Sequence, residues 1–143
     1  MRFVLAAPFV LLAACSQQSA PPSPIPPGPS SSASGGTQLV LRVGESAALG
    51  EDYRLSFQSV ASDSRCPTDV QCVWEGEAAL VVGPSHPLMR FRPDTLRLRG
   101  GRAVDSMQVG PFVVKPIALA PARLSTHPVP ADSYRATFAV RRR

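Results

Sequence analysis

The sequence predicts an all-β fold, and three patterns support this prediction. Several segments alternate apolar and polar residues with a period of two, as the strands of half-buried sheets do. Glycine and proline recur at intervals of roughly ten residues, which is typical of short strands joined by turns. No long segment has the i, i+3, i+4 and i+7 apolar spacing of an amphipathic helix.

Three segments show the alternation most clearly, and we expect each to form a strand with one apolar face. The first segment begins the domain, the second follows soon afterwards, and the third ends the domain. Their apolar faces are Leu39, Leu41 and Val43 in the first, Tyr53, Leu55 and Phe57 in the second, and Tyr134, Ala136, Phe138 and Val140 in the third. Arginine, serine, threonine and glutamine occupy most of the opposite faces, which indicates contact with solvent.

Three further strands are expected in the middle of the chain. Residues 78–82 form a short continuous apolar run, as in a strand that is covered on both faces. Leu96 and Leu98 alternate with arginines, and Gly100-Gly101 then provides a two-residue hairpin turn. We expect this turn to lead into a strand over residues 103–109.

The apolar segment from Phe112 to Leu119 is the last expected strand before the terminal one, and it contains Pro116. Proline lacks the N–H that a sheet ladder needs, so it favours an edge strand or a bulge. In all, about seven or eight short strands are expected, and this pattern favours an immunoglobulin-like β-sandwich over residues 38–143. That length is enough for one domain with a modest core.

The N-terminus has the features of an export signal. Met1-Arg2 precedes an apolar run over residues 3–12, and small residues precede Cys15. About ten apolar residues are too few to span a bilayer, which needs roughly 20. The segment is therefore expected to direct export without becoming a permanent anchor.

The string Leu12-Ala13-Ala14-Cys15 resembles the lipobox of bacterial lipoproteins. This resemblance implies removal of residues 1–14 and attachment of lipid to Cys15, so the membrane is the first expected partner. Ser16, rather than aspartate, implies sorting to the outer membrane in a Gram-negative host, with the domain facing the periplasm. The alternative is an ordinary secretory signal in which the cysteine has no role.

Residues 15–37 are expected to form a disordered linker behind the lipidated cysteine. This segment is rich in proline, serine and glycine and has almost no large apolar side chains. Proline favours the extended polyproline II conformation, at about 3.1 Å per residue, while serine and glycine are flexible. Such a composition cannot offset its own ordering entropy, so we interpret it as a spacer.

The remaining cysteines, Cys66 and Cys72, are expected to form a disulfide. Export places them in an oxidising compartment, where pairing is the default. Closing such a short loop stabilises the fold by about 2 kcal/mol if loop entropy dominates. A redox role is disfavoured, because reactive pairs usually have a Cys-x-x-Cys spacing at the start of a helix.

Residues 63–76, Asp-Ser-Arg-Cys-Pro-Thr-Asp-Val-Gln-Cys-Val-Trp-Glu-Gly, form the most distinctive stretch. It is similar to a family of uncharacterised bacterial lipoproteins and secreted domains with a Ser-Arg-Cys-Pro…Cys-x-Trp-x-Gly signature, and the likeness is clearest over residues 39–82. Glu75 departs from the small residue expected there, and Pro121-Ala122-Arg123 departs from an expected Pro-x-Pro turn. The resemblance implies an architecture but no activity.

Two interpretations of this stretch are open. In the first, Trp74 shares a strand face with Cys72 and packs over the disulfide or into the core. In the second, Arg65, Asp69, Trp74 and Glu75 form a polar and aromatic binding patch, with the composition of interface anchors.

Charge and composition narrow the function classes. The net charge of +5 comes almost entirely from arginine, and Arg141-Arg142-Arg143 form a basic tail that is either solvated or in contact with anionic lipid. Nucleic acid is disfavoured as a partner because of the compartment. The two histidines are far apart in sequence. The carboxylates at 63, 69, 75 and 77 are close together in sequence, and we interpret them as solvated charges of strand edges and not as a calcium or acid–base cluster. We expect no metal and no cofactor.

No catalytic motif is present, so we predict a protein that is not an enzyme. The expected function is that of a membrane-anchored binding or structural module of the cell envelope, with a protein or glycan partner. The alternative is inhibition of an envelope or host hydrolase through the loop of residues 66–72. Nothing in the sequence indicates an oligomeric state.

Overall fold

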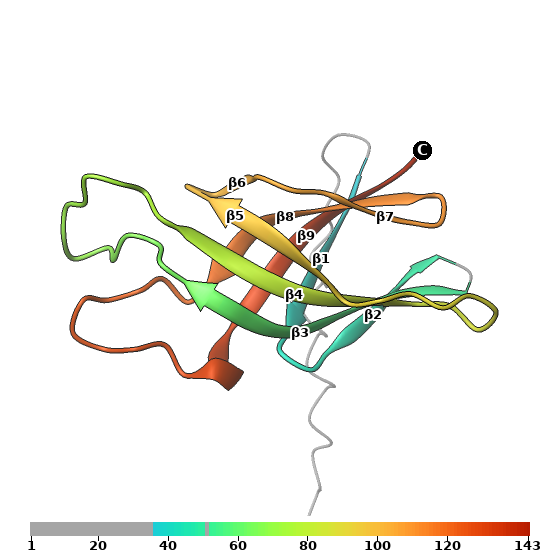
Figure 1. Cartoon of the computed structure of the whole chain (residues 1–143), viewed down its shortest axis with the longest axis horizontal. Helices are drawn as coiled ribbons and strands as arrows, with labels where there is room; N and C mark the ends of the chain where they lie inside the picture. The colour runs from blue at the N-terminus through green and yellow to red at the C-terminus, as the bar shows by residue number, and fades with distance from the viewer. Residues whose placement is uncertain (1–35, 51) are drawn as a thin grey trace, which may run out of the picture. The chain divides into compact units, whose positions relative to one another are not determined.

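The computed structural model describes residues 36–50 and 52–143 (Figure 1). The predicted signal peptide, Cys15 and all but the last two residues of the predicted linker lie outside the described residues. Within them, every regular element is a strand apart from one short 3-10 helix, η1 at Ala131–Ser133. The strands are β1 (Thr37–Arg42), β2 (Ser46–Gly50), β3 (Tyr53–Asp63), β4 (Glu77–Ser85), β5 (Asp94–Arg99), β6 (Arg102–Ala103), β7 (Met107–Val109), β8 (Phe112–Ala120) and β9 (Arg135–Arg142).

The described strands form two antiparallel sheets, with the orders β1-β9-β8-β7 and β2-β3-β4-β5-β6. The prediction of an all-β domain is therefore confirmed. Apart from β1 and β9, strands that pair are consecutive in the chain, and β1–β2 and β6–β7 connect one sheet to the other. Immunoglobulin-like sandwiches instead have Greek-key connections. Here only the pairing of β1 with β9 joins strands that are distant in the chain.

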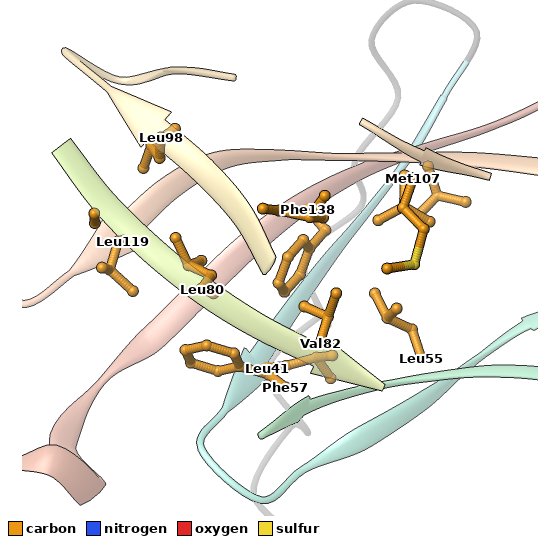
Figure 2. Packing of buried hydrophobic residues seen from close by; sticks show 14 of the residues in the cluster. Leu41, Leu55, Phe57, Leu80, Val82, Leu98, Met107, Leu119 and Phe138 are labelled. Atoms are coloured by element: carbon orange, nitrogen blue, oxygen red, sulfur yellow. The ribbon is translucent and has the colours of Figure 1, made fainter. Parts of the chain in front are cut away.

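The core lies between the two sheets and contains the apolar faces that the alternation predicts (Figure 2). Leu55 and Phe57 of β3 are fully buried, as are Ala136 and Phe138 of β9. The rings of Phe57 and Phe138 meet edge to face, with their centroids 6.1 Å apart, and so join the sheets. Burying a side chain of this size stabilises the fold by about 1.5–3 kcal/mol relative to leaving it exposed.

The prediction of one strand over residues 103–109 is wrong, because this segment is divided between the two sheets. Its first residue belongs to β6, and its last three form β7 in the other sheet. The reason lies at Asp105, whose carboxylate accepts a hydrogen bond from the backbone N–H of Arg97 at 3.1 Å. A side chain thus takes the place of the backbone acceptor that a longer β6 would offer to β5, and the chain leaves that sheet.

Pro116 and the short strand β2 can also be compared with the sequence prediction. Pro116 introduces a bulge, since the register of β8 against β9 shifts between Pro116 and Ala118. β7 pairs only with residues 112–114, so the missing N–H of Pro116 has no partner strand on that side. The short strand β2 was not predicted, because its Ser-Ala-Ala-Leu-Gly sequence has no clear alternation.

The domain has two ends, which carry different loops (Figure 1). At the end that we call the disulfide end, the β3–β4 loop (residues 64–76) lies beside the β8–β9 connection (residues 121–134). At the opposite end, the entry end, β1 begins, β9 finishes and the β4–β5 loop (residues 86–93) turns. No helix of the described residues has the length and apolar character needed to cross a bilayer.

Candidate interaction site at the disulfide end

The β3–β4 loop continues the hairpin beyond the strands. The N–H of Ser64 donates to the carbonyl of Glu77 at 2.8 Å, and the N–H of Cys66 donates to the carbonyl of Glu75 at 3.0 Å. Cys66 and Cys72 form the predicted disulfide, with a Cα–Cα distance of 5.9 Å. The loop is therefore closed covalently just beyond its last backbone hydrogen bond.

Gly76 explains the glycine of the Cys-x-Trp-x-Gly pattern. Its φ is +64°, a left-handed conformation that favours glycine. A Cβ at this position would also overlap the carbonyl oxygen of Ser64 across the hairpin. The close approach of the two loop strands thus depends on the absence of a side chain here.

Arg65 is held inside the structure by four acceptors. Its Nε and Nη2 donate to the two carboxylate oxygens of Asp63 at 2.8 and 2.7 Å, and its guanidinium also donates to the carbonyls of Leu119 and Pro121. The side chains of Arg65 and Asp63 are only 16% and 7% exposed. Arg65 therefore connects the β3–β4 loop to the end of β8, and little of it is left to contact a partner.

Tyr134 completes this network by donating from its hydroxyl to Asp63 Oδ2 at 3.0 Å. Burial alone would raise the pKa of Asp63, but hydrogen bonds and charge from Arg65, with the bond from Tyr134, outweigh it and lower that pKa. Burial, and then the neighbouring carboxylate, raise the pKa of Tyr134. Both shifts favour an ionised Asp63 beside a neutral tyrosine.

The β8–β9 connection is bonded to the β3–β4 loop along much of its length. The N–H of Thr68 donates to the carbonyl of Arg123 at 3.0 Å, and Arg123 Nη1 donates to the carbonyl of Arg65 at 2.7 Å. Asp69 accepts from the N–H and the hydroxyl of Ser125, at 2.9 and 2.6 Å. These bonds from Ser125 lower the pKa of Asp69. Two segments that are distant in sequence thus form one ordered surface.

Trp74 and Val73 project from this surface into solvent, with exposed fractions of 82% and 92%. The interpretation that placed Trp74 over the disulfide or in the core is therefore wrong. It assumed a strand through Cys72 and Trp74, whereas residues 73 and 74 lie in a bend outside any strand. Val70 and Leu124, on the two neighbouring loops, are also exposed, at 46% and 47%.

A groove beside Trp74 runs toward the sheet of β4 and β5. It is lined by Ser64, Trp74, Glu75, Gly76, Glu77 and Arg99. Arg99 Nη2 lies 2.8 Å from Glu77 Oε2, while Arg102 Nη2 lies 4.0 Å from Glu75 Oε1. Glu75 also lies against the Gly100 turn, where a Cβ would contact its carboxylate. The groove combines an aromatic side with balanced charges, a composition suited to a polar partner surface.

The four residues of the predicted patch thus have different positions. Trp74 and Glu75 line the groove together, whereas Arg65 and Asp69 hold the loops in place behind it. Sequence reasoning missed Val73 and the whole contribution of residues 121–134. The signal for Val73 was weak, because it is one apolar residue beside a tryptophan.

The carboxylates of the disulfide end do not converge on a common point. Asp63 pairs with Arg65, Asp69 with Ser125, and Glu77 with Arg99. Within residues 36–50 and 52–143, no group of three or more histidine, cysteine or acidic side chains is arranged to hold a metal ion. The site therefore presents exposed apolar and aromatic side chains beside paired charges on hydrogen-bonded loops.

No family model, curated protein or solved structure matches this chain.

Proposed function

We propose that this protein is a lipoprotein of the bacterial cell envelope, anchored through lipid on Cys15, whose β domain is a binding or structural module and not an enzyme. In a Gram-negative host the domain would face the periplasm. Membership of the Ser-Arg-Cys-Pro…Cys-x-Trp-x-Gly family is part of this proposal. We also propose that the domain resembles immunoglobulin-like domains in being a two-layer scaffold that carries loops at both ends. A protein or glycan partner binds at the disulfide end.

The observation that carries this proposal is the exposure of Val73 and Trp74 on an ordered loop. A tryptophan that is 82% exposed leaves most of its apolar surface in water, and its burial by a partner would be favourable. The disulfide and the bonds from Thr68 and Asp69 hold the surrounding loop before binding. Such pre-organisation lowers the entropy cost of association.

The position of this surface also supports the proposal. β1 begins at Thr37, opposite Val140, while the disulfide end lies beyond Asp63 and Ala120 at the far ends of β3 and β8. A chain that is anchored through its N-terminus would therefore present Trp74 on the side away from the point where the anchor segment joins the domain.

Crosslinking in live cells tests the proposal. A photoreactive residue at position 73 is expected to capture a specific protein or glycan. The matched control is position 40, which is also an exposed valine, at 63%, but on the outer face of β1. A product from position 73 that is absent from position 40 supports a partner at the disulfide end. Identical products from both positions, or no product from either, contradict it.

Trp74→Ala supplies the second part of this test. The variant is expected to lose the product captured from position 73 and to keep its melting temperature, because its side chain is mostly exposed. Loss of the melting transition would show instead that the tryptophan has a structural role.

The anchor is tested separately with Cys15→Ser. This variant is expected to leave the membrane fraction and appear in the soluble envelope fraction, since only the lipid would hold the mature chain. A variant that stays in the membrane fraction would contradict lipidation at Cys15.

Inhibition of a hydrolase is the second candidate function, and the covalently closed, projecting β3–β4 loop favours it. A rigid loop that enters a cleft loses little entropy on binding. In this case the purified protein would inhibit a member of a panel of proteases and lysozymes, and Trp74→Ala would relieve the inhibition. A panel that stays fully active would exclude the tested classes.

A further inference from the structure

The entry end carries a group of exposed arginines. They come from β3, the β4–β5 loop and the C-terminal residues, and all are exposed. This group, which we call the entry-end arginines, consists of Arg54, Arg90, Arg92, Arg141, Arg142 and Arg143. None of them lies within ion-pair distance of a carboxylate in the part of the chain that the structure describes.

The acidic side chains near this end are fewer. Asp52 lines a depression together with Arg54, and the carboxylate of Asp94 accepts a hydrogen bond from the N–H of Thr95. The sequence adds Glu51, whose place is not described. The six arginines therefore exceed the acidic residues around them, and the excess is free to attract anions.

An aromatic cluster joins the two parts of this surface. The ring centroid of Tyr53 lies 4.5 Å from that of His86 and 6.5 Å from that of Phe91, both in the β4–β5 loop. The same tyrosine lies 6.0 Å from Phe112, at the start of β8. Arg90 and Arg92 flank Phe91, while Arg141 and Arg142 line a depression with Phe112. Arginines of the loop and of the C-terminal residues thus lie next to members of one aromatic cluster.

Two apolar side chains project beside the loop arginines. Leu88 is 89% exposed and Met89 is 50% exposed, although the sulfur of Met89 accepts a hydrogen bond from the hydroxyl of Tyr53 at 3.8 Å. A surface that combines exposed arginines with projecting apolar side chains matches a lipid interface better than a soluble polyanion, which would contact the charges alone.

The chain also enters the domain at this end. Gly36 and Thr37 line the same depression as Phe112 and Arg141. If lipid is attached at Cys15, roughly 20 residues separate it from the domain, so the entry end stays within reach of the bilayer. A tether of this kind raises the effective concentration of the surface at the membrane, so a weak affinity is sufficient.

From these observations, we infer that the entry end docks on anionic lipid headgroups. The entry-end arginines contact phosphate and other acidic groups, and Leu88 and Met89 enter the interface between headgroups and acyl chains. Docking would turn the disulfide end away from the bilayer, toward the partner. The inference rests on the proposed function only for the lipid anchor, because the charges and apolar residues belong to the domain itself.

Vesicle sedimentation with an unlipidated chain tests the inference apart from the anchor. The mature chain from residue 15 onward, with Cys15→Ser, is mixed with phosphatidylcholine vesicles, with and without phosphatidylglycerol, at low and at high salt. Binding is expected only with the anionic lipid, and salt is expected to weaken it. Equal binding to both kinds of vesicle would overturn the inference. Because no lipid is attached, the result does not depend on modification of Cys15.

Matched pairs of substitutions locate the binding surface. Each arginine near an anionic membrane strengthens partition by about fivefold, so Arg90→Gln with Arg92→Gln is expected to weaken binding about 25-fold. Arg99→Gln with Arg102→Gln removes the same charge at the disulfide end and is expected to leave binding unchanged. Equal losses in the two pairs would show that only net charge matters and would overturn the inference.

The apolar contribution has its own variant. Leu88→Ser with Met89→Ser is expected to weaken binding to the anionic vesicles severalfold without a change of charge. Binding that is unaffected by this variant but lost on removal of the arginines would show that charge alone holds the domain on the membrane and would overturn the insertion of Leu88 and Met89. The melting temperatures of all variants are measured, and Arg141→Gln with Arg142→Gln replaces any loop variant that fails to fold.

Discussion

The two ends of this domain differ in the acceptors that their arginines contact. At the disulfide end, Arg65, Arg99 and Arg123 donate to carboxylates or backbone carbonyls. At the entry end, the six entry-end arginines form no ion pair with a described carboxylate. The apolar residues also differ, since Val73 and Trp74 project from a loop with a disulfide, whereas Leu88 and Met89 project from one without.

This difference shows that the same residue type can stabilise a fold or remain available for binding, according to its neighbours. A guanidinium that satisfies several acceptors in a partly buried network loses its freedom to recognise anything else. One that stays hydrated at the surface contributes little to stability but keeps its charge for a partner. Stability is therefore expected to depend on the arginine network of the disulfide end, and charge-dependent binding on the entry end.

The largest expected effect is that of Arg65→Ala. The substitution leaves Asp63 ionised in a site where its side chain is 7% exposed, and it removes the donors to Leu119 and Pro121. Breaking such a pair costs about 3 kcal/mol, to be measured as a loss in the free energy of unfolding by urea. The control is Arg97→Ala, which removes an exposed pair with Asp105 and should cost less than about 1 kcal/mol. Equal costs would show that the disulfide end has no special network.

The next effect is that of removing the disulfide, with Cys66→Ser and Cys72→Ser together. Loss of this short loop closure is expected to cost about 2 kcal/mol in the free energy of unfolding. Backbone amide exchange should also become faster at Thr68, whose N–H donates to Arg123. Unchanged exchange at Thr68 would mean that the hydrogen bonds alone order the two loops.

Acid is expected to have a smaller effect, with a sign set by Asp63. Its pKa in the folded protein is below the value of about 3.9 for an unfolded chain. The stability that its ionised form contributes is therefore complete above that value and is lost as the pH falls through the folded pKa. The urea midpoint should decrease as the pH falls below about 4, and Asp63→Asn should reduce this decrease. An unchanged pH profile in the variant would contradict the role of the network.

The smallest effect on stability is expected for Trp74→Ala, at less than about 0.5 kcal/mol, because the side chain is 82% exposed. Trp74 is the only tryptophan of the chain, so its fluorescence reports this loop alone. The emission maximum should already be that of a solvated indole and should shift little on unfolding. A large red shift on unfolding would place the side chain in an apolar environment and contradict the exposed site.

Much of the fold could be predicted because the burial pattern repeats locally. The alternation at residues 53–57 and 134–140 reports which face of each strand is buried, and both faces lie in the core. The Gly100-Gly101 turn was also predicted from the sequence, and both residues have the positive φ that favours glycine. The division of residues 103–109 between two sheets was not predictable, because it depends on a bond between Asp105 and a backbone N–H of another strand.

Only part of the candidate site could be predicted, because sequence patterns report local burial and not contacts between distant segments. The disulfide was predicted from the expected export signal and the cysteine count, which are both patterns of the sequence. Whether Trp74 is buried, and whether Arg65 faces solvent, depends on where residues 119–134 lie, and no local pattern contains that information. The Ser125 bonds to Asp69 join positions 56 residues apart.

By itself, the sequence determined the all-β class, the faces of most strands and the pairing of Cys66 with Cys72. Those features follow from alternation and residue chemistry within short segments. Only the tertiary structure decided that Arg65 is enclosed, that Trp74 is free, and that the entry-end arginines gather at the end where the chain enters. These outcomes depend on contacts between distant segments, and the free energy of such contacts is set by packing in three dimensions and not by neighbours in the chain.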